Sequence, residues 1–216
     1  MTTTLRLWDL PVRLVHWTFV LLLPALWWTG EEGDLDRHKT IGLVMIGLVA
    51  FRILWGLVGS ATARFASFIR GPGAILAYLR GGPAGLGHNP VGGWSVAIML
   101  LLLGGQAGFG LFAQDVDGLE SGPLSYLVSY DAADSAREWH NLGFDLILIV
   151  IGLHIAAILF YRLVKRDNLV TPMITGKREV EGVVAQPKLA PAWLAIACAL
   201  PAAGFAWWIS KGAPLP

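Results

Sequence analysis

The chain is poor in charged residues and has a single cysteine. Charged residues make up 14% of its 216 residues and hydrophobic residues 55%, whereas soluble domains carry roughly 25% charged residues. The lone Cys198 excludes an internal disulfide, cysteine ligation of an iron–sulfur cluster and the Cys-x-x-Cys-His motif that attaches a c-type haem. Internal repeats and low-complexity tracts are also missing. Any bound metal or cofactor must therefore be held by other side chains.

The hydrophobic residues lie in five blocks of about 20 residues, the length that crosses a hydrocarbon core roughly 30 Å thick. Lipid offers the backbone no hydrogen-bond partners, and no block alternates like a barrel strand, so each block is predicted to be a helix. The blocks are Leu10–Thr29, His38–Val58, Gly92–Ala113, Trp139–Tyr161 and Ala192–Ile209. We therefore predict an all-α membrane protein with a four-helix transmembrane bundle and a fifth, C-terminal transmembrane helix.

The charged residues of the connections predict the orientation. The second connection carries Arg64, Arg70 and Arg80 without any acid, and the fourth is also basic. The first connection is acidic, and so is the third, with Asp115, Asp117, Glu120, Asp131, Asp134 and Glu138. Because cytoplasmic connections carry the excess of positive charge, the N-terminus is predicted to be cytoplasmic and the C-terminus periplasmic. The first block lacks a small-residue cleavage pattern after Trp27 and Trp28, which favours a retained span over a signal peptide.

Four of the five histidines fall inside or at the ends of the predicted spans: His16, His38, His140 and His154. Ionisable residues are costly in a membrane, which makes each of them a functional candidate. The alternative is a hydrogen-bonding residue inside the bundle or a rim residue that reaches the headgroups. His140 and His154 are 14 residues apart, about 21 Å along one helix and within roughly 40° of one face. That spacing suits two stacked haems and is too long for one shared metal ion.

Each of these imidazoles has a partner at its own predicted depth. The directions of the helices place His38 and His140 near the periplasmic side, and His16 and His154 nearer the cytoplasm. We therefore predict two b-type haems, one ligated by His38 and His140 and the other by His16 and His154. Two filled axial positions favour electron transfer over oxygen chemistry. Zinc is the main competing metal, but two-histidine sites without nearby acids or cysteines suit it poorly.

Arg52 is a further candidate for cofactor binding. It follows His38 by 14 residues, so it lies on nearly the same helix face at the depth of the cytoplasmic pair. A buried arginine needs an anion, and haem propionates supply one. The alternative is that Arg52 reaches the inner lipid headgroups.

Taken together, these residues resemble the prokaryotic cytochrome b561 family, which includes the cytochrome b subunits of nickel–iron hydrogenases and formate dehydrogenases. The resemblance covers residues 6–178, with matching stretches at Pro11–Trp17, Arg37–Gly42, Phe51–Gly56, Ala63–Phe65, Tyr78–Gly81, Gly87–Pro90, Trp139–His140 and Leu153–His154. It implies a di-haem transmembrane bundle over residues 1–178 in a bacterial inner membrane. Residues 179–216 would then form a cytoplasmic linker and the additional transmembrane helix.

The resemblance also implies quinone-linked electron transfer, with the quinone as a mobile substrate close to the cytoplasmic haem. His88 and Asn89 lie in a cytoplasmic loop rich in glycine and proline. Both side chains can donate a hydrogen bond to a quinone carbonyl, so we predict that they line its headgroup pocket. The competing interpretation of His88 is a solvated loop histidine.

The sequence is compatible with several functions. The leading hypothesis is electron transfer between a membrane quinone and a periplasmic redox partner, such as a positively charged cytochrome c steered by the outer carboxylates. The alternatives are the membrane anchor subunit of a larger dehydrogenase or hydrogenase, a stand-alone superoxide–quinone oxidoreductase, and a transporter without cofactor. The sequence leaves open whether the chain is an enzyme alone and whether it forms a homodimer. Membrane lipid is an expected partner, and nucleic acid is not.

Overall fold

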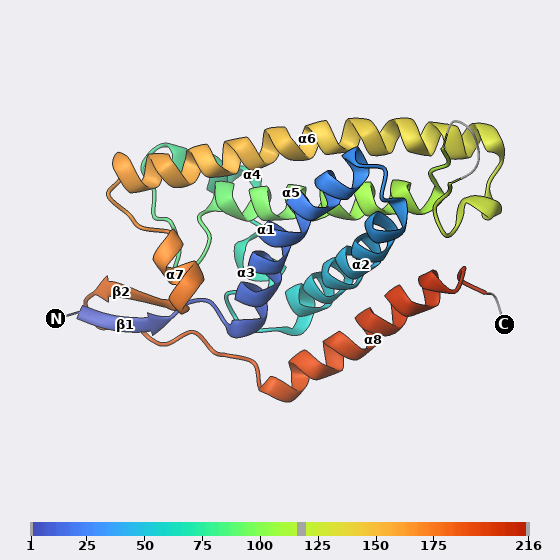
Figure 1. Cartoon of the computed structure of the whole chain (residues 1–216). Helices are drawn as coiled ribbons and strands as arrows, with labels where there is room; N and C mark the ends of the chain where they lie inside the picture. Colours follow the sequence, from blue (N-terminus) through green and yellow to red (C-terminus); the bar gives the residue numbers. More distant parts are fainter. Residues whose placement is uncertain (1, 116–119, 215–216) are drawn as a thin grey trace. The chain divides into compact units, whose positions relative to one another are not determined.

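The computed structural model describes residues 2–115 and 120–214. Within this part of the chain, five helices are long and apolar enough to cross a membrane (Figure 1). They are α1 (Leu10–Glu31), α2 (Leu35–Val58), α5 (Pro90–Phe112), α6 (Tyr130–Leu163) and α8 (Ala192–Ser210). The five predicted spans are therefore confirmed. Of the acids used to predict the orientation, Asp117 lies outside the described residues.

Helix α6 begins nine residues before the apolar block that predicted it. The added turns carry Asp131 and Asp134 together with Ala133 and Ala136, which are buried. Alanine favours a helix, and the Ser129 hydroxyl accepts a hydrogen bond from the Ala132 amide at the start of α6. A search for apolar blocks misses such amphipathic turns because their charged residues lower the local hydropathy.

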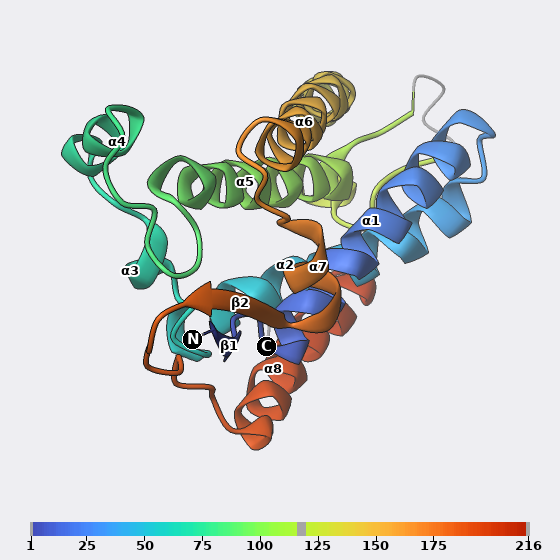
Figure 2. The same ribbon diagram turned by 90° about the vertical axis from the view of Figure 1, so that its left-hand side faces the viewer.

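Short elements precede the first long helix and lie between the long helices. They are the helices α3 (Phe65–Phe68), α4 (Pro72–Leu79) and α7 (Val170–Thr175), the 3-10 helix η1 (Ser125–Leu127), and the strands β1 (Thr2–Arg6) and β2 (Lys177–Glu181). The strands pair antiparallel, with Thr2 opposite Glu181 and Arg6 opposite Lys177, and α7 leads directly into β2 (Figure 2). The spans are helical as predicted, and this two-stranded ribbon is an addition that the apolar pattern did not indicate.

The chain forms two compact units, each assembled from segments that are distant in sequence. The first unit contains residues up to His16, Arg52–Met99 and Val150–Ile196. The second contains Trp17–Phe51, Leu100–Ile149 and the residues from Ala197 onward. Every long helix contributes residues to both units. The division of the sequence near residue 178 into a bundle and an added helix stays a prediction.

In the first unit, the core joins the N-terminal segment to the end of α2. Leu5, Leu7 and Trp55 are almost completely buried. The Trp55 indole donates to Asp9 Oδ2 at 2.9 Å, and Asp9 Oδ1 accepts the Val12 amide at 2.9 Å. Asp9 therefore caps α1 and anchors it to α2 through one buried carboxylate.

In the second unit, α8 packs against α2. Gly47 of α2 lies so close to α8 that a Cβ there would be 3.5 Å from Ala206 Cβ and 3.7 Å from the Ala202 carbonyl oxygen. Small residues allow apolar helices to approach in this way. Ile46 and Ile209 then join a buried apolar cluster. The fifth helix is thus part of the packing around α2.

Candidate functional site

The second unit brings His38 of α2 and His140 of α6 face to face. Their ring centroids are 6.0 Å apart, and the ring planes are inclined at 78°. A ligating imidazole nitrogen lies about 2 Å from a bound metal, with the ring centre about 1 Å beyond it, so two rings on opposite sides of one iron stand roughly 6 Å apart. The pair therefore has the spacing that a bis-histidine haem requires.

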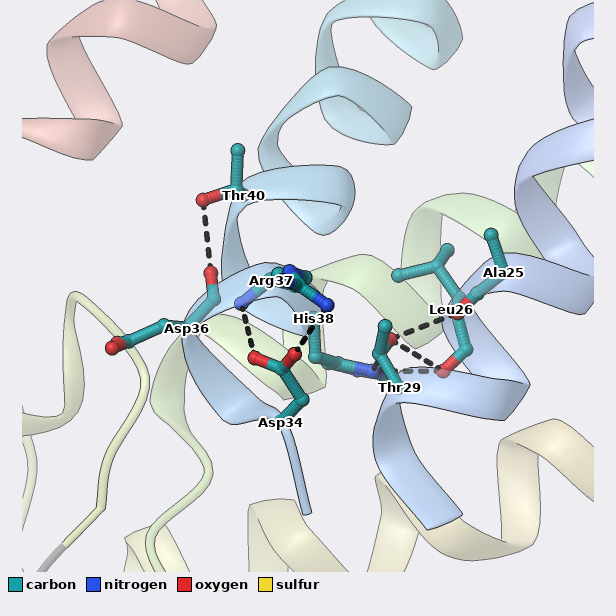
Figure 3. A network of polar contacts seen from close by, with 8 residues as sticks. All are labelled: Ala25, Leu26, Thr29, Asp34, Asp36, Arg37, His38 and Thr40. Carbon is teal, nitrogen blue, oxygen red and sulfur yellow. Dashed lines mark hydrogen bonds and ion pairs between the residues drawn. The ribbon is translucent and has the colours of Figure 1, made fainter. Parts of the chain in front are cut away.

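Backbone carbonyls orient both rings. His38 Nδ1 donates to the Leu26 carbonyl of α1 at 2.9 Å and lies 3.3 Å from the Thr29 hydroxyl (Figure 3). His140 Nδ1 donates to the Gln106 carbonyl of α5 at 2.8 Å. Because a carbonyl oxygen only accepts, the proton sits on Nδ1, and Nε2 keeps its lone pair for a metal.

A cavity of about 620 Å³ adjoins these two histidines. Ligand pockets typically measure roughly 300–1,000 Å³, so the volume is of the right order for a prosthetic group. Its walls come from α1, α2, α5, α6 and the α5–α6 connection, and they carry both apolar and charged side chains. Gly110 leaves room for the His140 ring, because a Cβ at this position would lie 2.8 Å from His140 Cε1.

The first unit holds the other predicted pair, His16 of α1 and His154 of α6. Their ring centroids are 6.5 Å apart, and the ring planes are inclined at 55°. This spacing also fits two imidazoles on opposite sides of one iron. Among the described residues, no group of three or more His, Cys, Asp or Glu side chains could hold a metal ion. A porphyrin brings four equatorial nitrogens of its own, so two protein ligands suffice for it.

Arg52 lies inside the first unit and is 5% exposed. Its Nη1 donates to the Ala63 carbonyl at 3.3 Å, and its guanidinium stands 5.2 Å from the centre of the Phe65 ring. The Asp9 carboxylate also attracts it. Its charge therefore has a partner within the protein, and its role toward a haem propionate stays a prediction.

His88 lies between two aromatic rings instead of in open solvent. Trp8 and Phe68 each stand 4.6 Å from it between ring centroids. Its Nδ1 is buried without a hydrogen-bond partner in the described part of the chain. Burial, together with the charges of Arg52 and His154, lowers the pKa of His88 to about 4, so the ring is neutral at pH 7. His88 is thus close enough to His154 for their charges to interact.

Asn89 caps α5 and connects it to α6. Its Oδ1 accepts the Gly92 amide at 2.7 Å, and its Nδ2 donates to the Tyr161 hydroxyl at 2.8 Å. The Tyr161 hydroxyl also makes a short contact with the hydroxyl of Tyr78 in α4. One N–H of Asn89 remains for other partners. Tyr78 begins one of the stretches that carry the family resemblance, but neither tyrosine was predicted to belong to the site.

Lys39 and Glu120 were also missed, although both line the cavity beside His38 and His140. Lys39 Nζ lies 2.7 Å from Glu120 Oε2 and 3.4 Å from Asp36 Oδ1. The one available signal was the position of Lys39, directly after His38. Its partner Glu120 lies 81 residues away, and nothing in the sequence indicates that pairing.

Comparisons with known proteins identify the family of the chain. The family model described as prokaryotic cytochrome b561 matches residues 7–176. A protein named probable Ni/Fe-hydrogenase B-type cytochrome subunit, from Bradyrhizobium diazoefficiens, is 22% identical over 82% of this chain and 86% of its own length. A protein of the same name from Rhizobium leguminosarum bv. viciae is 21% identical over 79% of this chain and 87% of its own. No solved structure matches the chain. As a multi-pass membrane cytochrome of the b type, with haem and a role in electron transport, the chain belongs to the prokaryotic cytochrome b561 family.

Proposed function

We propose that this cytochrome holds two b haems, one between His38 and His140 and one between His16 and His154, and passes electrons between a membrane quinone and a redox enzyme. The observation that carries the proposal is the spacing of the two pairs, 6.0 Å and 6.5 Å between ring centroids. Two pairs of side chains from different helices, each at the distance one iron requires, support two separate cofactors.

The protein's part in this function is to bind and orient. When bound, each haem supplies a one-electron carrier with no open coordination position. The Leu26 and Gln106 carbonyls hold the Nδ1 protons of His38 and His140, which directs each Nε2 toward the cofactor and raises its basicity. Gly110 leaves room for the His140 ring.

The quinone is proposed to bind beside His88. The charge of His154, a ligand of the proposed haem in the first unit, acts on His88, which supports a quinone position near that haem. His88 is neutral at pH 7 and has a buried nitrogen available, which suits its ring to hydrogen-bond a quinone headgroup. The remaining Asn89 N–H and the Tyr78 and Tyr161 hydroxyls are further donors nearby.

The partner is proposed to be a subunit of a larger redox enzyme. Both relatives carry the name of a Ni/Fe-hydrogenase cytochrome subunit, which favours the anchor-subunit function over a stand-alone oxidoreductase. Acidic side chains in the first and third connections would steer a positively charged partner surface to the predicted periplasmic side. Membrane orientation is part of this proposal.

Haem counting after single histidine replacements tests the proposal. Purified wild-type protein should contain two b haems per chain in a pyridine haemochrome assay. Replacing His38, His140, His16 or His154 with alanine should remove the haem of the affected pair and leave the other low-spin. The matched control is His88→Ala, which should keep both haems. Two haems retained after any of the four ligand replacements would refute the assignment.

A further inference from the structure

Two basic residues flank His38, and they differ in environment. Lys39 lines the cavity next to His38 and His140, and its side chain is 32% exposed. Arg37 does not belong to the cavity lining, and its side chain is 79% exposed. Arg37 pairs with Asp34 at 3.1 Å on the surface of α2, as Figure 3 shows. The same helix turn thus offers one cation beside the cavity and one in solvent.

The partner of Lys39 comes from a different part of the chain. Glu120 lies in the α5–α6 connection, and its Oε2 is 2.7 Å from Lys39 Nζ. The part of this connection that follows Glu120 is held against the end of α5, because Gly122 donates to the Ala113 carbonyl and Leu124 to the Leu111 carbonyl. Glu120 lines the same cavity as Lys39. A pair of opposite charges is therefore fixed in the wall of the cavity that contains both histidines.

We propose that Lys39 and Glu120 set the reduction potential of the haem held between His38 and His140. The inference rests on the proposed function, because it requires a haem at this pair. Reduction adds one negative charge to the site. The charge of Lys39 favours that step and the charge of Glu120 opposes it, so together they keep the potential at an intermediate value. Lys39 and Glu120 are partly buried, so water and salt screen their charges less than they would screen a fully exposed pair.

The other charged residues of the cavity lining are the same in wild type and in the Lys39 and Glu120 variants. They are Glu31, Asp115, Arg137 and Asp145. Arg137 is already engaged with Asp134, at 2.6 Å. Among the charged lining residues described, Lys39 is the one directly joined to a ligand of the proposed haem along the chain. Removing the charge of Lys39 should therefore change the reduction potential of this haem most clearly.

The test is a spectroelectrochemical titration of the full-length protein with both haems bound. Lys39→Gln should lower the reduced-to-oxidised ratio of the His38–His140 haem at a fixed ambient potential by about three- to tenfold. A tenfold change corresponds to about 59 mV for one electron. Glu120→Gln should shift the ratio in the opposite direction, and the double variant should return toward wild type. The matched control Arg37→Gln should change the ratio less than about twofold, and the other haem should not respond.

Shifts of Lys39→Gln and Glu120→Gln in the same direction, or no larger than that of Arg37→Gln, would overturn the inference. If Lys39→Gln fails to retain the haem, the exchanged pair Lys39→Glu with Glu120→Lys replaces it. That variant preserves an ion pair but puts the negative charge beside His38, so its potential must fall, and an unchanged potential would equally refute the proposal. If His38→Ala keeps both haems, the proposed function fails. If His38→Ala loses one haem while the charge variants do nothing, only this inference fails.

Discussion

His38 and His140 face each other at 6.0 Å between ring centroids, and the Nδ1–H of each ring donates to a backbone carbonyl of a further helix. Four helices thus cooperate in one site, because α1 and α5 orient the rings that α2 and α6 supply. A backbone carbonyl cannot be removed by a side-chain replacement. The orientation of the two rings therefore depends on how closely the helices pack.

Gly110→Ala should disturb the His38–His140 site. The added Cβ would lie 2.8 Å from His140 Cε1 and 3.0 Å from its Nδ1, so the ring must move and its bond to the Gln106 carbonyl weakens. We expect haem content to fall toward one per chain, with altered low-spin signals from any haem that remains. Gly105→Ala on the same helix is the matched control, since its Cβ would meet nothing within 4 Å. Equal haem contents of the two variants would contradict the role of Gly110.

Asp9→Ala should destabilise the first unit by about 2–4 kcal/mol. The replacement removes the cap of α1, leaves the buried Trp55 N–H without its acceptor and deprives Arg52 of a neighbouring negative charge. Thermal unfolding in detergent measures the effect. Asp34→Ala is the comparison, because Asp34 caps the start of α2 through the Arg37 amide but lies at the surface. Its loss should cost about 1 kcal/mol. A smaller effect at Asp9 than at Asp34 would argue against the buried network.

Acid should destabilise the protein through His88. The pKa of His88 is lowered from 6.5 to about 4 in the folded chain, so the unfolded chain binds a proton more readily. Stability is therefore complete above pH 6.5 and falls as the pH drops toward 4, by up to about 3 kcal/mol from this group. Thermal unfolding between pH 4.5 and 7.5 should show a shallower acid dependence for His88→Gln than for wild type. Parallel pH profiles would exclude His88 as the source.

Replacements of Asn89 should separate its capping role from its proposed role at the quinone. Asn89→Asp keeps an oxygen for the Gly92 amide but cannot donate to the Tyr161 hydroxyl. We expect the cap of α5 and the haem spectra to be retained, with electron exchange between haem and quinone slowed about tenfold by the loss of one hydrogen bond to the headgroup. Asn89→Ala should slow exchange and also lower stability by about 1 kcal/mol. Stopped-flow reoxidation by a quinone analogue measures the rate, and a wild-type rate in both variants would move the quinone site elsewhere.

The sequence by itself determined the membrane spans. Lipid forces every spanning segment to satisfy its own backbone, so a block of about 20 apolar residues has one stable conformation and can be recognised locally. The 14-residue interval between His140 and His154 likewise follows from helix geometry alone. The start of α6 at Tyr130 did not follow, because its first turns are charged and rely on Ala133 and Ala136 being buried against other segments.

Tertiary structure decided everything that depends on residues far apart in the chain. The Leu26 and Gln106 carbonyls that hold the histidines, the pairing of Lys39 with Glu120, and the position of His88 between Trp8 and Phe68 have no local signature. Any carbonyl, acid or aromatic ring of the sequence could have filled these roles. Which one does so depends on the packing of the helices and connections, since a hydrogen bond or ion pair forms only between groups that packing brings within about 3 Å.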